Sequence, residues 1–129
     1  MFQLYGRISA GKPILAEENI TGYLPIDPRI YGRSTTNELF FLLVNGNSMN
    51  KKVKNGDYAL IQKQEIAENG DIIVALIENE VTLKQYKRLD EQFVMLEPMS
   101  TEQFEPIIID LKKTKLNIIG KMIGYFGRC

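Results

Sequence analysis

The sequence predicts a mainly β fold, and three of its features predict it. From Leu39 onward the apolar residues come in short runs rather than at helical spacing, and turn-forming residues separate the runs. Two of the separating segments, residues 55–57 and 69–71, read Asn-Gly-Asp, which is typical of tight turns. Residues 81–87 alternate as a strand does, which places Val81, Leu83 and Gln85 on one face and Thr82, Lys84 and Tyr86 on the other. We therefore expect a compact antiparallel β domain.

Each apolar run is assigned to one strand, and the short segments between runs are assigned to turns. The segment Glu78-Asn79-Glu80 is short and polar, so it predicts a hairpin between two of the strands. The polar stretch from Pro98 to Pro106 predicts a longer loop. The expected strands are Leu39–Val44, Tyr58–Gln62, Ile72–Ile77, Val81–Lys87, Phe93–Glu97, Ile107–Leu111 and Leu116–Tyr125.

Residues 1–38 have a different composition. Glycine and proline interrupt this stretch too often for long regular elements, so we expect an extended arm and loop that packs on a core formed by residues 39–129. A chain of 129 residues is long enough for one compact domain and leaves little room for a second. We expect one structural domain overall.

The composition excludes several classes of function. Sixteen basic residues balance sixteen acidic ones, so the general attraction to phosphate on which DNA binders depend is missing. The single cysteine, Cys129, allows no intramolecular disulfide, and neither a signal peptide nor an apolar run of about 20 residues is present, so a cytoplasmic location is expected. With no histidine, we expect no metal and no cofactor.

The absence of histidine also limits the catalytic mechanisms. Ser-His-Asp and Cys-His mechanisms both need an imidazole, so a nucleophile in this chain needs a different base. A lysine whose amine has lost its proton can serve, and serine with lysine is a nucleophile–base pair that a chain without histidine can still assemble. Absence of histidine is weak evidence by itself.

Ser48 is the candidate nucleophile. It follows an apolar strand within Val44-Asn45-Gly46-Asn47-Ser48-Met49, where Gly46 can turn the backbone and lift the hydroxyl clear of the sheet. The backbone N–H groups of Asn47 and Ser48 are candidates for stabilising an oxyanion, and Met49 is a candidate support of the turn. Most serines that follow a glycine in a turn only satisfy local backbone groups, so the motif alone also fits a turn serine or a helix cap.

Lys84 is the candidate base. It lies on the same face of its expected strand as Thr82, which could orient the amine, whereas Lys87 lies on the opposite face and Arg88 stays charged. Burial would lower the pKa of Lys84 and leave a neutral amine able to accept the serine proton. A lysine on the solvent face beside an ordinary cross-strand threonine is the competing interpretation.

The segment Gly6-Arg7-Ile8-Ser9-Ala10-Gly11 lies in the arm. The peptide bond between Ala10 and Gly11 carries almost no side-chain bulk, so a narrow cleft can close around it. By itself, a Ser-Ala-Gly tripeptide indicates only a loop.

Taken together, these segments resemble the carboxy-terminal domain of LexA-like repressors, a serine–lysine peptidase family shared with phage repressors and UmuD-like proteins. Residues 6–13 resemble the family's cleavage region with the scissile bond at Ala10-Gly11, residues 46–49 resemble its nucleophile motif, and residues 81–84 resemble the strand that bears its lysine. Residues 67–75, Ala-Glu-Asn-Gly-Asp-Ile-Ile-Val-Ala, resemble the segment between them. The similarity runs from about Tyr5 almost to the end of the chain.

The resemblance implies a repressor of DNA-damage (SOS) genes that dimerises and cuts itself when a RecA–single-stranded-DNA filament stimulates it. Operator DNA would be bound only by an amino-terminal helix-turn-helix domain, which this chain lacks. The residues around Gly46 and the slightly short 50–55 loop depart from typical LexA, so a phage-type repressor or a UmuD-like domain stays open.

Two other classes compete with a self-cleaving domain. One is a non-catalytic dimerisation module with a protease-like fold, in which Leu116–Tyr125 pairs with its copy across a two-fold axis. The other is a signal-peptidase-like enzyme acting on other proteins, which the lack of a membrane anchor disfavours.

Overall fold

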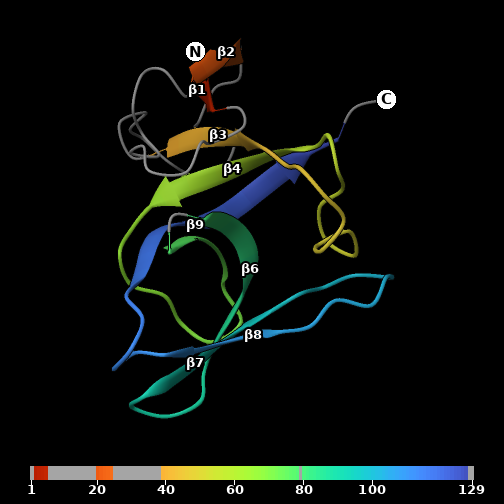
Figure 1. Ribbon diagram of the computed structural model, residues 1–129. Helices are drawn as coiled ribbons and strands as arrows, with labels where there is room; N and C mark the ends of the chain where they lie inside the picture. Colours follow the sequence, from red (N-terminus) through yellow and green to blue (C-terminus); the bar gives the residue numbers. More distant parts are fainter. Residues whose placement is uncertain (1, 6–19, 25–38, 79, 128–129) are drawn as a thin grey trace.

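The computed structural model describes residues 2–5, 20–24, 39–78 and 80–127, which form nine strands and no helix (Figure 1). None of the described segments is therefore a helix long and apolar enough to cross a membrane. The strands are β1 (Phe2–Tyr5), β2 (Ile20–Leu24), β3 (Leu39–Leu43), β4 (Tyr58–Lys63), β5 (Ile72–Ile77), β6 (Glu80–Arg88), β7 (Phe93–Glu97), β8 (Ile107–Asp110) and β9 (Leu116–Phe126).

The nine strands form one sheet in the order β2-β1-β3-β4-β9-β5-β6-β7-β8. Every neighbouring pair is antiparallel except β1 and β3, which are parallel. The prediction of a mainly antiparallel β fold is confirmed. From Leu39 onward the expected strand bounds agree with the structure to within about one residue, the usual uncertainty of strand ends.

The amino-terminal stretch differs from what its composition indicates. Two short strands, β1 and β2, pair with each other there, and β1 adds to the edge of β3 through Leu4↔Phe41 and Tyr5↔Leu42. Such short strands carry little local signal, because it is the edge of β3 that pairs with β1 and supplies the hydrogen bonds. The predicted cleavage site at Ala10-Gly11 falls between these strands in sequence and lies outside the described residues.

Strand β9 joins the two halves of the sheet. Its residues 116–121 pair with β5 and its residues 120–126 pair with β4, so the strand passes from one neighbour to the other along its length (Figure 1). The register shifts on both sides, which marks bulges that bend and twist a strand. At Gly120 a Cβ atom would lie 2.5 Å from the Gln62 carbonyl oxygen and 2.6 Å from Ile61 Cγ2, so this close approach requires glycine.

Alternating side chains of the central strands fill separate clusters on the two faces of the sheet. In β5, Ile72 and Val74 belong to a cluster with Phe40 and Met49, while Ile73 and Ala75 belong to a second cluster. A strand buried on both faces reads as a continuous apolar run, which explains the Ile-Ile-Val-Ala-Leu-Ile sequence of β5. The first cluster lies beneath the connection between β3 and β4, which contains Ser48.

Candidate active site

Ser48 lies in the connection that leaves β3 and returns as β4. Gly46 adopts φ 98°, a left-handed conformation that favours glycine, and its N–H donates to Asn55 Oδ1 at 2.8 Å. After the serine, the Met49 carbonyl accepts hydrogen bonds from the N–H groups of Lys52 and Val53 at 2.9 and 2.8 Å. The serine thus stands at the start of a tight hydrogen-bonded turn.

The side chains of Met49 and Val53 anchor this turn. Both are buried, and both belong to the first core cluster. Because Met49 follows Ser48 directly, its burial fixes the backbone on which the hydroxyl is carried. Residues 45–47 remain exposed, so the hydroxyl lies at the boundary between core and solvent.

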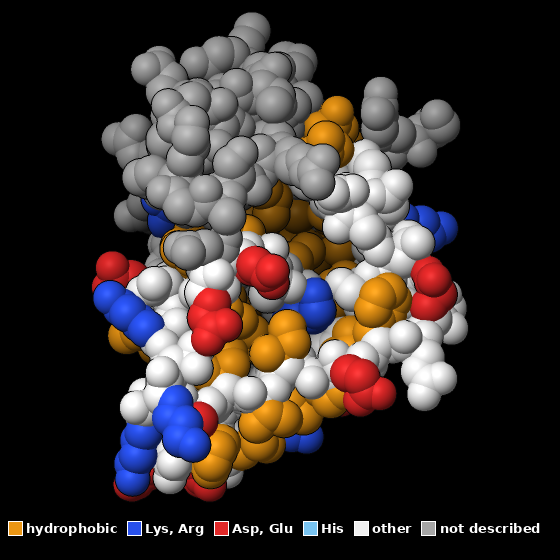
Figure 2. Space-filling view, in the orientation of Figure 1, with side chains coloured by type: hydrophobic (Ala, Val, Ile, Leu, Met, Phe, Trp, Pro, Cys, Tyr) orange, Lys and Arg blue, Asp and Glu red, His pale blue; other side chains and the backbone are white. Residues whose placement is uncertain are grey.

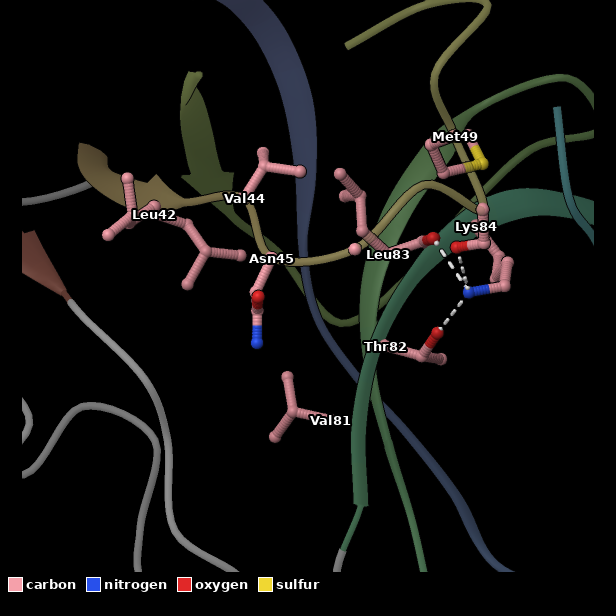
Figure 3. Close-up of a pocket in the computed structure, with 11 residues that line it drawn as sticks. Leu42, Val44, Asn45, Met49, Val81, Thr82, Leu83 and Lys84 are labelled. Atoms are coloured by element: carbon pink, nitrogen blue, oxygen red, sulfur yellow. Dashed lines mark hydrogen bonds between the residues drawn. The ribbon is translucent and has the colours of Figure 1, made fainter. Parts of the chain in front are cut away.

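Lys84 reaches Ser48 from β6. Its Nζ lies 2.9 Å from Ser48 Oγ, 2.6 Å from Thr82 Oγ1 and 3.2 Å from the Leu83 carbonyl oxygen, and it donates to all three (Figure 3). Strand β7 pairs with β6 only from Gln85 to Arg88, so the edge of β6 before Gln85 has no partner among the described strands. The Lys84 amine thus contacts Thr82, two residues earlier on its own strand, and Ser48 on the β3–β4 connection at the same time.

Burial lowers the pKa of the Lys84 ammonium, because loss of hydration penalises the charged form. Within the described part of the chain no carboxylate forms an ion pair with Lys84 to offset this effect. The lysine is half-buried, whereas its neighbours Lys87 and Arg88 are exposed. Of these three residues, only Lys84 combines desolvation with contact to a hydroxyl.

A cavity of about 260 Å³ opens beside the Ser48 hydroxyl and the Lys84 amine. The space-filling view shows a hollow with hydrophobic side chains in its wall near the middle of the face (Figure 2). In the close-up, Leu42 and Val44 come from one side of the cavity and Val81 and Leu83 from the other (Figure 3). The lining residues are Leu42, Leu43, Val44, Asn45, Gly46, Ser48, Met49, Val81, Thr82, Leu83 and Lys84.

The backbone of the turn carries donors that the described residues leave unused. The N–H groups of Asn47, Ser48 and Met49 form no hydrogen bond within this part of the chain, whereas Gly46 before them and Asn50 after them both donate. Unpartnered N–H groups are uncommon in the buried parts of proteins, and of these three residues Met49 is buried, Ser48 is half-buried and Asn47 is exposed. Such groups can stabilise negative charge on an oxygen bound next to Ser48.

The structure brings together the site residues Ser48, Lys84, Thr82 and Met49, which belong to two separate sequence motifs. Ala10 and Gly11, the residues of the predicted cleavage site, lie outside the described residues. The described residues contain no group of three or more His, Cys, Asp or Glu side chains placed to hold a metal ion.

Sequence reasoning missed one segment of the site, residues Met99–Thr101. They follow β7 and make hydrogen bonds to the Ser48 turn, although the polar Pro98–Pro106 stretch indicates only a loop. No local pattern carries this information, because the contact joins residues that lie about fifty positions apart in the chain.

The fold and the site together define a β domain with a serine–lysine pair at the edge of a cavity. The chain belongs to the peptidase S24-like family, whose model matches residues 3–123. This match covers both motifs of the site and nearly the whole chain.

The chain is also similar to proteins named LexA repressor. It is 42% identical over 126 residues to the one from Clostridium acetobutylicum, 45% over 121 residues to the one from Petrotoga mobilis and 42% over 124 residues to the one from Leptospira biflexa. These alignments cover 97%, 92% and 95% of this chain but only 58%, 57% and 57% of the relatives. The chain therefore spans little more than half the length of the curated relatives it matches.

Proposed function

We propose that this domain is an autoproteolytic module that cuts its own Ala10-Gly11 bond, with Ser48 as nucleophile and Lys84 as general base. The observation that carries the proposal is the 2.9 Å separation of Lys84 Nζ and Ser48 Oγ. A hydroxyl is a poor nucleophile until a base removes its proton, and this is hydrogen-bond distance for that transfer. The family match and the lack of histidine support the same assignment.

The proposed reaction has two steps. In the first, the neutral Lys84 amine takes the Ser48 proton while Oγ attacks the Ala10 carbonyl carbon, and the resulting oxyanion is stabilised by free N–H groups of the turn. The intermediate collapses with cleavage of the bond to Gly11, whose amine takes the proton from Lys84. In the second, Lys84 takes a proton from water as its oxygen attacks the acyl ester, the C–Oγ bond then breaks to release the Ala10 carboxylic acid, and Oγ takes the proton back from Lys84.

The cavity walls fit the small residues at the proposed bond. Leu42, Val81 and Leu83 supply the apolar part of a lining that also carries polar groups, and about 260 Å³ is enough room for the small side chains of such a segment. Ala10 and Gly11 are among the least bulky residues that a peptide can present. Apolar walls also exclude water from the amine, which maintains its lowered pKa.

At the level of the whole protein, we propose a LexA-like repressor of the DNA-damage (SOS) response that acts in the cytoplasm. A RecA–single-stranded-DNA filament would stimulate the cleavage, and operator DNA would be bound by an amino-terminal domain rather than by this neutral one. The similarity to proteins named LexA repressor supports this reading over a phage-type or UmuD-like protein.

Dimerisation through the last strand is the remaining part of the proposal. Residues 116–121 of β9 already pair with β5, so a second copy would add to residues 122–126, whose β5-side edge has no partner among the described strands. Tyr125 in this segment is 44% exposed. Sedimentation of the purified chain over a range of concentrations measures this association.

The central test compares the wild type with Ser48→Ala and Lys84→Ala. Each protein is incubated at alkaline pH, and the products are weighed by mass spectrometry, with the exposed Lys87→Ala as a matched control. We expect a fragment that ends at Ala10 from the wild type and from the control, and none from the two site variants. A wild type that yields no such fragment, even with activated RecA filament, would contradict the autoproteolytic proposal and leave the non-catalytic dimerisation module as the alternative.

A further inference from the structure

The segment Met99–Thr101, here called the bridge, contacts the nucleophile turn along its outer side. The Met99 N–H donates to the Ser48 carbonyl oxygen at 2.9 Å, and the Lys51 N–H donates to the Met99 carbonyl oxygen at 2.9 Å. The Ser100 hydroxyl donates to the Asn47 carbonyl oxygen at 2.7 Å. Two consecutive carbonyl groups, those of Asn47 and Ser48, are therefore bound by the bridge.

Binding of these carbonyl groups fixes the direction of the N–H groups beyond them. In a planar trans peptide the C=O and N–H point in opposite directions, so the N–H groups of Ser48 and Met49 point away from the bridge. Both groups lack a partner among the described residues. The bridge thus orients two of the free donors that stand next to the Ser48 hydroxyl.

A second contact holds the bridge in register. Thr101 N–H donates to Asn50 Oδ1 at 2.8 Å, and Asn50 Nδ2 donates to Thr101 Oγ1 at 3.0 Å. This two-bond pair lies at the exposed end of the bridge, so it contributes little to burial in the core. Its evident consequence is geometric: it prevents the bridge from sliding along the turn.

The bridge also connects the nucleophile to the strand that bears the lysine. Strand β7 pairs with β6 up to Glu97↔Gln85, one residue beyond Lys84, and the chain then leaves the ladder to become the bridge. Two residues after Glu97, the Met99 N–H donates to the Ser48 carbonyl oxygen, so backbone hydrogen bonds connect the residue next to Lys84 with Ser48 through only a few residues of chain.

We propose that Ser100 and Asn50 are positioning residues for catalysis by Ser48: Ser100 fixes the peptide plane that presents the Ser48 N–H to the oxyanion, and Asn50 holds the bridge that does so. This inference rests on the proposed function, because it presupposes that Ser48 is a nucleophile. Neither residue touches the reacting atoms.

The test measures two reactions of Ser48 in the purified full chain. One is self-cleavage, followed as a first-order rate at its alkaline limit. The other is labelling by a fluorophosphonate, in which Oγ forms a bond to phosphorus, fluoride leaves, Lys84 takes the serine proton, and the phosphoryl oxygen occupies the oxyanion position. Both reactions are run well below the melting temperature of each variant, so that a loss of folded protein does not contribute.

We expect Ser100→Ala to lower both rates roughly tenfold. This is a smaller effect than removal of an oxyanion donor, because the Ser48 N–H would still be present but would point in the wrong direction. Ser100→Thr keeps the hydroxyl and should restore at least half of the wild-type rate. Thr114→Ala, which removes a hydroxyl that makes no described hydrogen bond in the β8–β9 turn, should match the wild type. Asn50→Ala combined with Ser100→Ala should lose less than the product of the two single losses, because both act on one turn.

Wild-type rates in Ser100→Ala, or a Ser100→Thr variant as slow as Ser100→Ala, would overturn the positioning role. Labelling without cleavage in the wild type would count against the proposed self-cleavage, while the labelling rates of the variants would still decide the role of Ser100. If the wild type is neither cleaved nor labelled, Ser48 is not a nucleophile and both proposals fail.

Discussion

The Lys84 amine nitrogen lies 2.9 Å from the Ser48 hydroxyl oxygen, although 36 positions separate the two residues in the chain. The serine is carried by the connection between β3 and β4, and the lysine by the second strand of the β5–β6 hairpin. Strands β4, β9 and β5, which lie between β3 and β6 in the sheet, determine how these two elements meet. The pair is thus a product of sheet curvature and not of local sequence.

The first prediction concerns the pH dependence of self-cleavage. Because burial lowers the pKa of Lys84 and only the neutral amine accepts a proton, the cleavage rate should rise with pH and level off below the ordinary lysine pKa of about 10.4. The rate of fragment formation from about pH 7 to pH 10 measures this. A rate that stays flat over this range would argue against Lys84 as the base.

The second prediction concerns the effect of Lys84 on stability. Burial penalises the charged form of Lys84, and Lys84→Met removes the ionisable amine while keeping much of the side-chain volume. As pH rises through the lowered folded-state pKa, the folded wild type releases a proton that the unfolded chain keeps up to about pH 10.4, so wild-type stability increases in that window.

The free energy of unfolding of Lys84→Met relative to the wild type should therefore decrease as pH rises toward about 10. Urea denaturation at several pH values gives this difference when both proteins also carry Ser48→Ala, so that neither cuts itself, and the titration of the other lysines cancels in it. A difference that is constant with pH would mean that the pKa of Lys84 is the same in the folded and unfolded states.

The third prediction concerns Thr82, whose Oγ1 accepts a hydrogen bond from Lys84 Nζ at 2.6 Å. Thr82→Val keeps the shape and removes the acceptor, so the amine loses its orientation toward Ser48, and the cleavage rate at its alkaline limit should fall about tenfold. Loss of an acceptor also disfavours the ammonium, so the midpoint of the pH profile should move to lower pH. Thr82→Ser retains the acceptor and should keep the wild-type midpoint.

The fourth prediction concerns the sheet that supports the site. Gly120→Ala places a Cβ atom 2.5 Å from the Gln62 carbonyl oxygen and should cost about 1–3 kcal/mol of stability, because backbone atoms of β4 have to shift. Gly56→Ala is the comparison: it has φ 91° with nothing within 4 Å of the added atom, so it isolates backbone strain of about 1 kcal/mol. Equal stability of Gly120→Ala and the wild type would contradict the close β4–β9 approach.

The strands from Leu39 onward were predictable because each is specified by its own residues. In β5 six consecutive apolar residues lie between turns, and in β6 the alternation places Val81 and Leu83 against the first core cluster and Tyr86 in the second. A local pattern of this kind predicts a strand whichever elements the strand packs against. The strands β1 and β2 were not predictable, because β1 pairs with the edge of β3 and β2 in turn pairs with β1.

Among the candidate site residues, Ser48 and Lys84 were identified from residue type, motif and the absence of histidine. Thr82 follows from Lys84, because alternate residues of a strand share a face. Ser100 and Asn50 carry no comparable signal: a serine and an asparagine in polar loops are ordinary, and their relation exists only through hydrogen bonds to the turn of Ser48.

The sequence by itself determined the class of fold and the chemistry that is available, since apolar periodicity specifies strands and a chain without histidine limits the choice of base. Only the tertiary structure decided which lysine is desolvated, which N–H groups are left free and how far Nζ lies from Oγ. The physical reason is that burial, pKa and hydrogen-bond distance depend on neighbours far away in sequence, which the curvature of the sheet brings together.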